Sequence, residues 1–119
     1  MNSKVSKIVE FAREKKSLYP VVLDLRKVAN FCDFFIILTG TSRPHIKAIA
    51  DGINEGLSGQ GMKFHHCEGY NESKWVVLDY ADVIVHIFDD ETRSFYDLEH
   101  LWADAPKVIQ NRKKKQGDR

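Results

Sequence analysis

Three groups of side chains in this sequence are of types that carry chemistry. The Gly40–Ser42 turn follows an apolar run and precedes a helical pattern, where backbone N–H groups can bind a phosphate. Enzymes that transfer nucleotidyl groups also need two or three carboxylates around a divalent metal ion. Just after the turn the only carboxylate is that of Asp51, and Asp79 and Asp82 are three residues apart across a second predicted turn. The spacing therefore disfavours catalysis, and a nucleotidyltransferase-like enzyme that binds phosphate or nucleotide with Gly40–Ser42 is the alternative hypothesis.

Histidine and cysteine side chains raise the question of a metal site. His65, His66 and Cys67 are consecutive, and His86 lies in a later apolar run. Because neighbouring strand residues point to opposite faces, His65 and His66 cannot readily share one ion, and zinc requires convergent ligands. Cys67 and the other cysteine, Cys32, form no CxxC pair and are predicted to be free thiols. We therefore expect no metal and no cofactor.

The stretch from Trp75 to Pro106 is acidic and rich in aromatic side chains. It carries eight Asp and Glu residues against a single Arg, Arg93, which gives a net charge of −7. Such a surface repels the phosphates of nucleic acid and attracts a basic protein. A charged stretch is also common on any solvated surface, which is the plain alternative. The aromatic residues interleaved with the acids are Trp75, Tyr80, Phe88, Phe95, Tyr96 and Trp102.

Within this stretch we select candidates for contact with a basic protein partner. Buried aromatic side chains dominate binding energy at interfaces, and rim carboxylates set the rate and salt dependence of association. Each candidate also has an ordinary explanation, since aromatic residues favour strands, Asp favours turns, and a histidine among apolar neighbours is usually a core residue. Truncation of Trp75 or Tyr80 is predicted to weaken binding more than truncation of Glu99. The candidates are Trp75, Asp79, Tyr80, Asp82, His86, Tyr96, Glu99 and Trp102.

The composition indicates one folded domain with a basic end. The chain has 119 residues, 43% of them hydrophobic, and no apolar run that approaches the ~18 residues of a membrane span. Residues 1–106 carry sixteen acids and twelve bases, whereas residues 107–119 carry a net charge of +5. We expect 1–106 to form the domain and 107–119 to be a disordered basic tail. The first residues do not resemble a signal peptide, so a cytoplasmic location is expected. The tail residues that could contact the phosphate backbone of an RNA are Arg112, Lys113, Lys114 and Lys115.

Hydrophobic periodicity predicts the elements that position these residues. Helical spacing is found near residues 5–16 and 43–57, with Ser42 as a cap of the second helix. A third helix is predicted before Pro106, with a core stripe of Phe95, Leu98, Leu101 and Ala105. Strands are predicted near residues 21–25, 34–38, 63–67, 75–78 and 83–88. The element order α-β-β-α-β-β-β-α predicts an α/β (α+β) fold, with a mixed five-stranded sheet flanked by helices.

Four segments carry a resemblance to a known family. They are CDFFIILTGTSRPHIKAIA, the EGY before Trp75, WVVLDYADVIVHIF and RSFYDLEHLW. In this order they closely resemble the ribosomal silencing factor family, also called the Iojap family, over roughly residues 5–103. The resemblance implies a nucleotidyltransferase-like fold that has lost catalysis. It also implies binding to large-subunit ribosomal protein fourteen, which would block joining of the small subunit and repress translation under nutrient limitation. Members of the family are often homodimers when free.

One position departs from the family pattern. Ala81 stands between the last two predicted strands, where the family commonly has Gly. If this turn requires a positive φ, Ala carries a steric cost that Gly avoids. The placement of Tyr80 and Asp82 depends on which turn forms.

Overall fold

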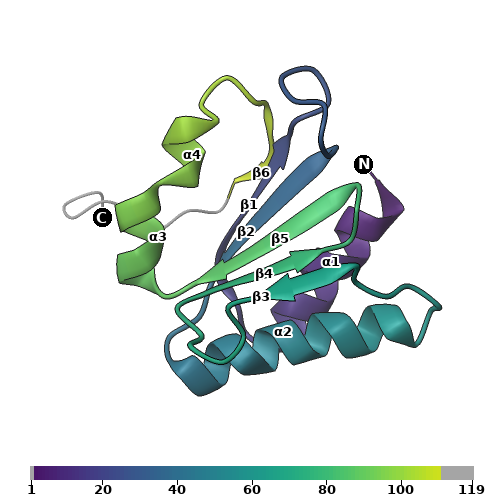
Figure 1. Cartoon of the computed structure of the whole chain (residues 1–119), viewed down its shortest axis with the longest axis vertical. Helices are drawn as coiled ribbons and strands as arrows, with labels where there is room; N and C mark the ends of the chain where they lie inside the picture. The colour runs from purple at the N-terminus through teal and green to yellow at the C-terminus, as the bar shows by residue number, and fades with distance from the viewer. Residues whose placement is uncertain (1, 111–119) are drawn as a thin grey trace.

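One mixed sheet with helices on both of its faces makes up the computed structural model, which describes residues 2–110 (Figure 1). The helices are α1 (Ser3–Glu14), α2 (Arg43–Ser58), α3 (Asp90–Tyr96) and α4 (Leu98–Leu101). The strands are β1 (Leu18–Asp24), β2 (Phe34–Thr39), β3 (His66–Glu68), β4 (Trp75–Asp79), β5 (Val83–Phe88) and β6 (Lys107–Gln110). Their order in the sheet is β3-β4-β5-β2-β1-β6. The α+β class and the mixed sheet are as predicted, and none of the described helices has the length and apolar character to cross a membrane.

The sheet has six strands, so the prediction of five was wrong. The sixth strand, β6, pairs antiparallel with β1 and uses residues that were predicted to belong to the tail. Ile109 lies opposite Val22 and packs against the main core, which fixes this short segment by tertiary contact. Four residues are too few to show a period in the sequence, and the basic residues that follow mask them. The domain therefore extends at least to Gln110, and the predictions for Arg112 and Lys113–Lys115 concern residues outside those described.

The centre of the sheet is β2, which pairs antiparallel with β1 and parallel with β5. Every residue of β2 is buried, as the uninterrupted apolar run predicted. One face of the sheet is covered by α1 and α2, and the core there includes Ile36, Val76 and Val85. The other face carries a smaller core under α3 and α4. In Figure 1, α3 and α4 lie beside β1 and β2 and leave β3, β4 and β5 uncovered from this side.

The start of α2 is fixed by its capping residues. Ser42 Oγ accepts a hydrogen bond of 3.2 Å from the His45 N–H, which confirms the predicted cap. A Cβ on Gly40 would lie 2.6 Å from Cγ1 of Ile46, so only Gly allows β2 to approach the helix this closely. His45 Nε2 donates to the carbonyl oxygen of Lys15 at 2.8 Å and joins the beginning of α2 to the end of α1.

The predicted single helix before Pro106 is two short helices. Asp97 adopts a left-handed conformation with φ of 46°, ends α3, and caps α4 through its carboxylate. This residue changes the helical phase, so the predicted core stripe was wrong for Phe95, which is 79% exposed, and for Leu101, which is 70% exposed. Leu98 packs against the smaller core, as does Trp102, the residue that follows α4.

Candidate protein-docking site

The uncovered part of the sheet presents the outward side chains of β4 and β5. Trp75 lies opposite Phe88, Val77 opposite His86, and Asp79 opposite Ile84. Trp75, Val77 and Ile84 are only half-buried, although they lie in the middle of a sheet. We call this surface the open face and define it by Trp75, Val77, Asp79 and Ile84.

A row of aromatic rings runs along the border between the open face and α3–α4. Trp75 lies 4.6 Å from the Tyr96 ring of α3 and 6.0 Å from His86. His86 lies 4.5 Å from Phe35, whose ring is 6.0 Å from that of Trp102. The structure therefore brings together Trp75, His86, Tyr96 and Trp102, four candidates that are distant in sequence. Phe31 extends the row, with its ring 5.9 Å from Trp102.

His86 is a buried residue that holds the Trp75 side chain of the open face in place. Its Nδ1 accepts a hydrogen bond of 3.1 Å from Nε1 of Trp75, which orients the indole. Burial lowers the pKa of His86 to about 3, so the ring is neutral at pH 7. Only 6% of the residue is exposed, which favours a supporting role for His86 over the predicted direct contact with a partner. Its buried Nε2 finds no hydrogen-bond partner among residues 2–110.

Tyr80, predicted as a docking residue, belongs to the hydrophobic core, which disfavours direct contact with a partner. It is 2% exposed and packs near Phe64, with the rings 6.4 Å apart. Burial raises the pKa of its phenol to about 12. Trp75, Val77 and Asp79 point to the open face, so Val76, Leu78 and Tyr80 point to α1 and α2. The odd spacing between Trp75 and Tyr80 was the sequence signal that they lie on opposite faces.

Glu99 is also buried, which disfavours its predicted place in the contact surface. Its Oε1 accepts a hydrogen bond of 2.9 Å from Nε of Arg93, and each of these side chains is 9% exposed. Nη1 of Arg93 donates to the carbonyl oxygen of Tyr19 and to Oγ1 of Thr39, both at 2.8 Å. The pair therefore holds α3 and α4 against the sheet, and with them Tyr96 and Trp102.

Asp79 and Asp82 shape the turn between β4 and β5. Asp79 Oδ1 accepts a hydrogen bond of 2.8 Å from the N–H of Ala81, whose φ is 75°. Asp82 Oδ1 pairs with Nζ of Lys4 at 2.6 Å and joins the turn to α1. Both carboxylates keep partial exposure at one end of the open face. Across residues 2–110, no three His, Cys, Asp or Glu side chains are grouped so that they could hold a metal ion.

The Gly40–Ser42 turn uses its backbone donors within the chain. The N–H of Gly40 donates to the carbonyl oxygen of Phe88 at 2.9 Å, and that of Thr41 to Nδ1 of His45 at 2.8 Å. The His45 N–H is held by the Ser42 cap. A phosphate at this helix N-terminus would have to displace these bonds, so the geometry disfavours the nucleotidyltransferase-like alternative.

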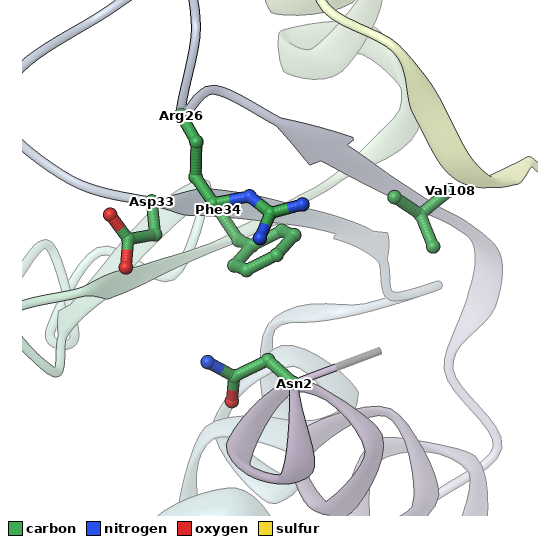
Figure 2. Close-up of a pocket in the computed structure, with 5 residues that line it drawn as sticks. All are labelled: Asn2, Arg26, Asp33, Phe34 and Val108. Atoms are coloured by element: carbon green, nitrogen blue, oxygen red, sulfur yellow. The ribbon is translucent and has the colours of Figure 1, made fainter.

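A cleft of about 420 Å³ lies at the far edge of the sheet, away from the open face (Figure 2). Arg26 stands over the Phe34 ring at 5.2 Å, and its guanidinium makes two hydrogen bonds to Asp24, of 2.9 and 2.7 Å. The side chain of Asn2, also in Figure 2, caps α1. Because these polar groups are engaged within the chain, we assign the cleft no function.

The open face is therefore the candidate protein-binding surface of this fold. Its aromatic centre is only half-covered by the chain itself, and carboxylates lie at its ends. Three exposed or partly exposed residues of this surface were not selected from the sequence, although the strand partners of β4 could have indicated two of them. They are Phe31, Val77 and Ile84.

Comparison with known proteins places the chain in one family. Residues 1–119 match the family described as ribosomal silencing factor during starvation. A ribosomal silencing factor of Halalkalibacterium halodurans is 38% identical over 95 residues, which are 80% of this chain and 81% of that protein. The corresponding protein of Bacillus subtilis is 37% identical over 108 residues, 89% of this chain and 92% of that one. The chain belongs to the ribosomal silencing factor family.

Two solved structures support the fold. A crystal structure of a Chromobacterium violaceum protein has a TM-score of 0.83 at 26% identity and covers 95% of this chain and 98% of that one. A Bacillus halodurans structure has a TM-score of 0.79 at 33% identity, with 88% and 95% covered. The chloroplastic Iojap protein of Zea mays is 34% identical over 85% of this chain, which spans 44% of that longer protein. The relatives from Halalkalibacterium halodurans and Bacillus subtilis are named as ribosomal silencing factors, which is a regulatory role.

Proposed function

We propose that this protein is a non-catalytic, cytoplasmic factor whose open face binds large-subunit ribosomal protein fourteen. Bound there, it blocks joining of the small subunit and represses translation when nutrients are limiting. Family membership supports a role at the ribosome. The observation that carries the docking proposal is the partly exposed Trp75, held in place by His86 where the uncovered sheet surface meets α3.

The chemistry of the open face fits a basic protein. Trp75, Val77 and Ile84 supply an apolar centre that a partner can exclude from water. Carboxylates border it, because Asp79 lies at one end of β4 and the exposed Glu68 of β3 lies opposite Val77. An apolar centre with a charged rim is the usual arrangement of a specific interface. Opposite charge on the partner would then set the rate of association.

In this proposal the candidate residues have two different roles, according to their exposure. Trp75, Asp79, Tyr96 and Trp102 remain in the proposed contact surface, since each is at least partly exposed. Asp82 has partial exposure but is already paired with Lys4, so its contribution is to the turn first. The buried residues Tyr80, His86 and Glu99 act by holding the surface in shape.

Substitution of the central indole tests the proposal. Trp75→Ala should weaken binding to purified large subunits by about 30-fold, the effect of losing ~2 kcal/mol at a hot spot. Tyr70→Ala is the matched control, because Tyr70 is a half-buried aromatic residue that packs beside α2 and bonds Asp51. It should change the affinity less than threefold. Equal effects of the two variants, measured on samples shown to be folded, would remove the open face from the proposal.

The open face is also the proposed interface of a homodimer when the protein is free of the ribosome. An uncovered apolar patch is commonly covered by a partner in solution, and the family resemblance implies a homodimer. In this proposal, two free chains form a homodimer in which their open faces are in contact. Sedimentation equilibrium should show a dimer for the natural chain and a monomer for Trp75→Ala, and a monomer for both would contradict this part.

A further inference from the structure

The last described strand directs the chain toward α3. β6 runs antiparallel to β1 with Gln110 opposite Val21, so it heads toward the beginning of β1. There the carbonyl oxygen of Tyr19 accepts a hydrogen bond of 2.8 Å from Nη1 of Arg93, in the middle of α3. With ~3.3 Å per strand residue and ~4.8 Å between strands, the Gln110 backbone lies roughly 8 Å from Tyr19. The chain therefore leaves the described fold beside α3.

The outward side of α3 combines carboxylates with aromatic rings. Asp90 and Glu91 are exposed in its first turn. Phe95 is 79% exposed and Tyr96 50% exposed in its last turn, with their rings 5.0 Å apart. Glu91 and Phe95 are four residues apart and therefore share one side of the helix. Carboxylates beside ring faces are the groups that bind Lys and Arg, through ion pairs and cation–π contacts.

The exposed charges around the outward side of α3 are negative, apart from any charge on His100. From residue 89 to residue 104 the exposed charged side chains other than His100 are acidic. The single Arg in this range, Arg93, is buried against Glu99 and does not offset them. The exposed acids are Asp90, Glu91, Asp97 and Asp104.

The last nine residues have the complementary chemistry and sufficient length. Residues 111–119 carry five Lys and Arg against one Asp, a net charge of +4, and no large apolar side chain. Fully extended they reach ~30 Å, whereas α3 with its seven residues is ~10 Å long. We propose that Arg112 and Lys113–Lys115 bind in cis to the acidic, aromatic side of α3 and so compete with the basic ribosomal partner. Their methylene stems cover the rings while their charged groups meet the carboxylates.

This arrangement makes the basic end an internal competitor of docking. The competition rests on the proposed function, because Tyr96 belongs both to α3 and to the aromatic row beside Trp75. A tethered segment acts at an effective concentration in the millimolar range, so even weak exposed ion pairs are substantially occupied. Salt screens such pairs, so the competition should be strong at low ionic strength and small at high ionic strength.

The cis contact is tested without the ribosome. The full chain is compared by amide NMR with a variant of equal length that carries Arg112→Gln, Lys113→Gln, Lys114→Gln and Lys115→Gln. The signals of residues 90–97 should differ at low salt, and the difference should vanish at 0.5 M NaCl. Glu91→Lys should abolish the difference, whereas Glu14→Lys, an exposed site on α1, should not. Identical signals for residues 90–97 in the two chains would overturn the proposal, whatever the chain binds.

The competition is then measured on large ribosomal subunits. The four-fold Gln variant should bind them roughly three- to tenfold more tightly than the natural chain at low salt, with the ratio approaching one at high salt. Weaker binding would show that these residues contact ribosomal RNA instead and would overturn the competition, as would unchanged binding. Loss of all binding by the natural chain would refute the proposed function and leave the NMR result to decide the cis contact.

Discussion

Removal of the Arg93 guanidinium should be among the most damaging single changes in this protein. In Arg93→Met the methylene volume is kept, but the Glu99 carboxylate stays buried without the guanidinium that contacts it at 2.9 Å. The carbonyl oxygen of Tyr19 and Oγ1 of Thr39 also lose their donor. Breaking a buried ion pair from one side typically costs ~3–5 kcal/mol. For a domain of this size that corresponds to a fall in Tm of roughly 10 °C or more.

The assay is urea unfolding followed by tryptophan fluorescence, since Trp75 and Trp102 both lie in the aromatic row beside α3–α4. Arg93→Lys should lose about 1–2 kcal/mol, because an ammonium keeps the charge but lacks the planar fork that reaches three acceptors. Arg13→Met is the control, since Arg13 is 75% exposed and lies 3.8 Å from Glu10. It should cost less than ~0.5 kcal/mol. A loss for Arg93→Met no larger than that control would refute the assigned role of the pair.

Three further outcomes are expected. Ala81→Gly should stabilise the fold by about 1 kcal/mol, measured by urea unfolding, because the turn holds φ at 75° and only Gly adopts this without steric cost. Gly40→Ala should destabilise it by about 1–3 kcal/mol in the same assay, since the new Cβ would lie 2.6 Å from Ile46. His86 has a pKa of about 3 when folded and 6.5 as its ordinary value, so the unfolded chain binds the proton first as the pH falls. Stability from this residue is therefore complete above pH ~6.5 and falls by about 2 kcal/mol by pH 5, and His86→Phe should flatten that part of the pH profile.

Local patterns were sufficient for the elements that bury a regular face. The unbroken run of β2 and the stripe of α2 with its Ser42 cap correspond to the observed elements. The segment after β5 could not be derived in this way, because the left-handed Asp97 divides one helical pattern into two helices. β6 depends on pairing with β1 across more than eighty residues, for which four residues give no signal.

The candidate site was predictable in part for the same reason. Acids and aromatics indicated the segment that includes the open face, but which side chains face outward depends on the alternation of β4 and on long-range bonds. Strand alternation places the Tyr80 side chain on the other face of the sheet from that of Trp75. The burial of Glu99 follows from Arg93, whose other acceptors, Tyr19 and Thr39, are 74 and 54 residues away in sequence. A local sequence pattern cannot predict contacts between residues that are this far apart in the chain.

The most direct test of the account is sedimentation of the purified chain with separated ribosomal subunits. The natural chain should migrate with large subunits and reduce the amount of joined ribosomes when small subunits are added. Trp75→Ala should do neither at the same concentration, while Tyr70→Ala should behave like the natural chain. A natural chain that stays at the top of the gradient with large subunits present, or that binds them and leaves joining unchanged, would contradict the account.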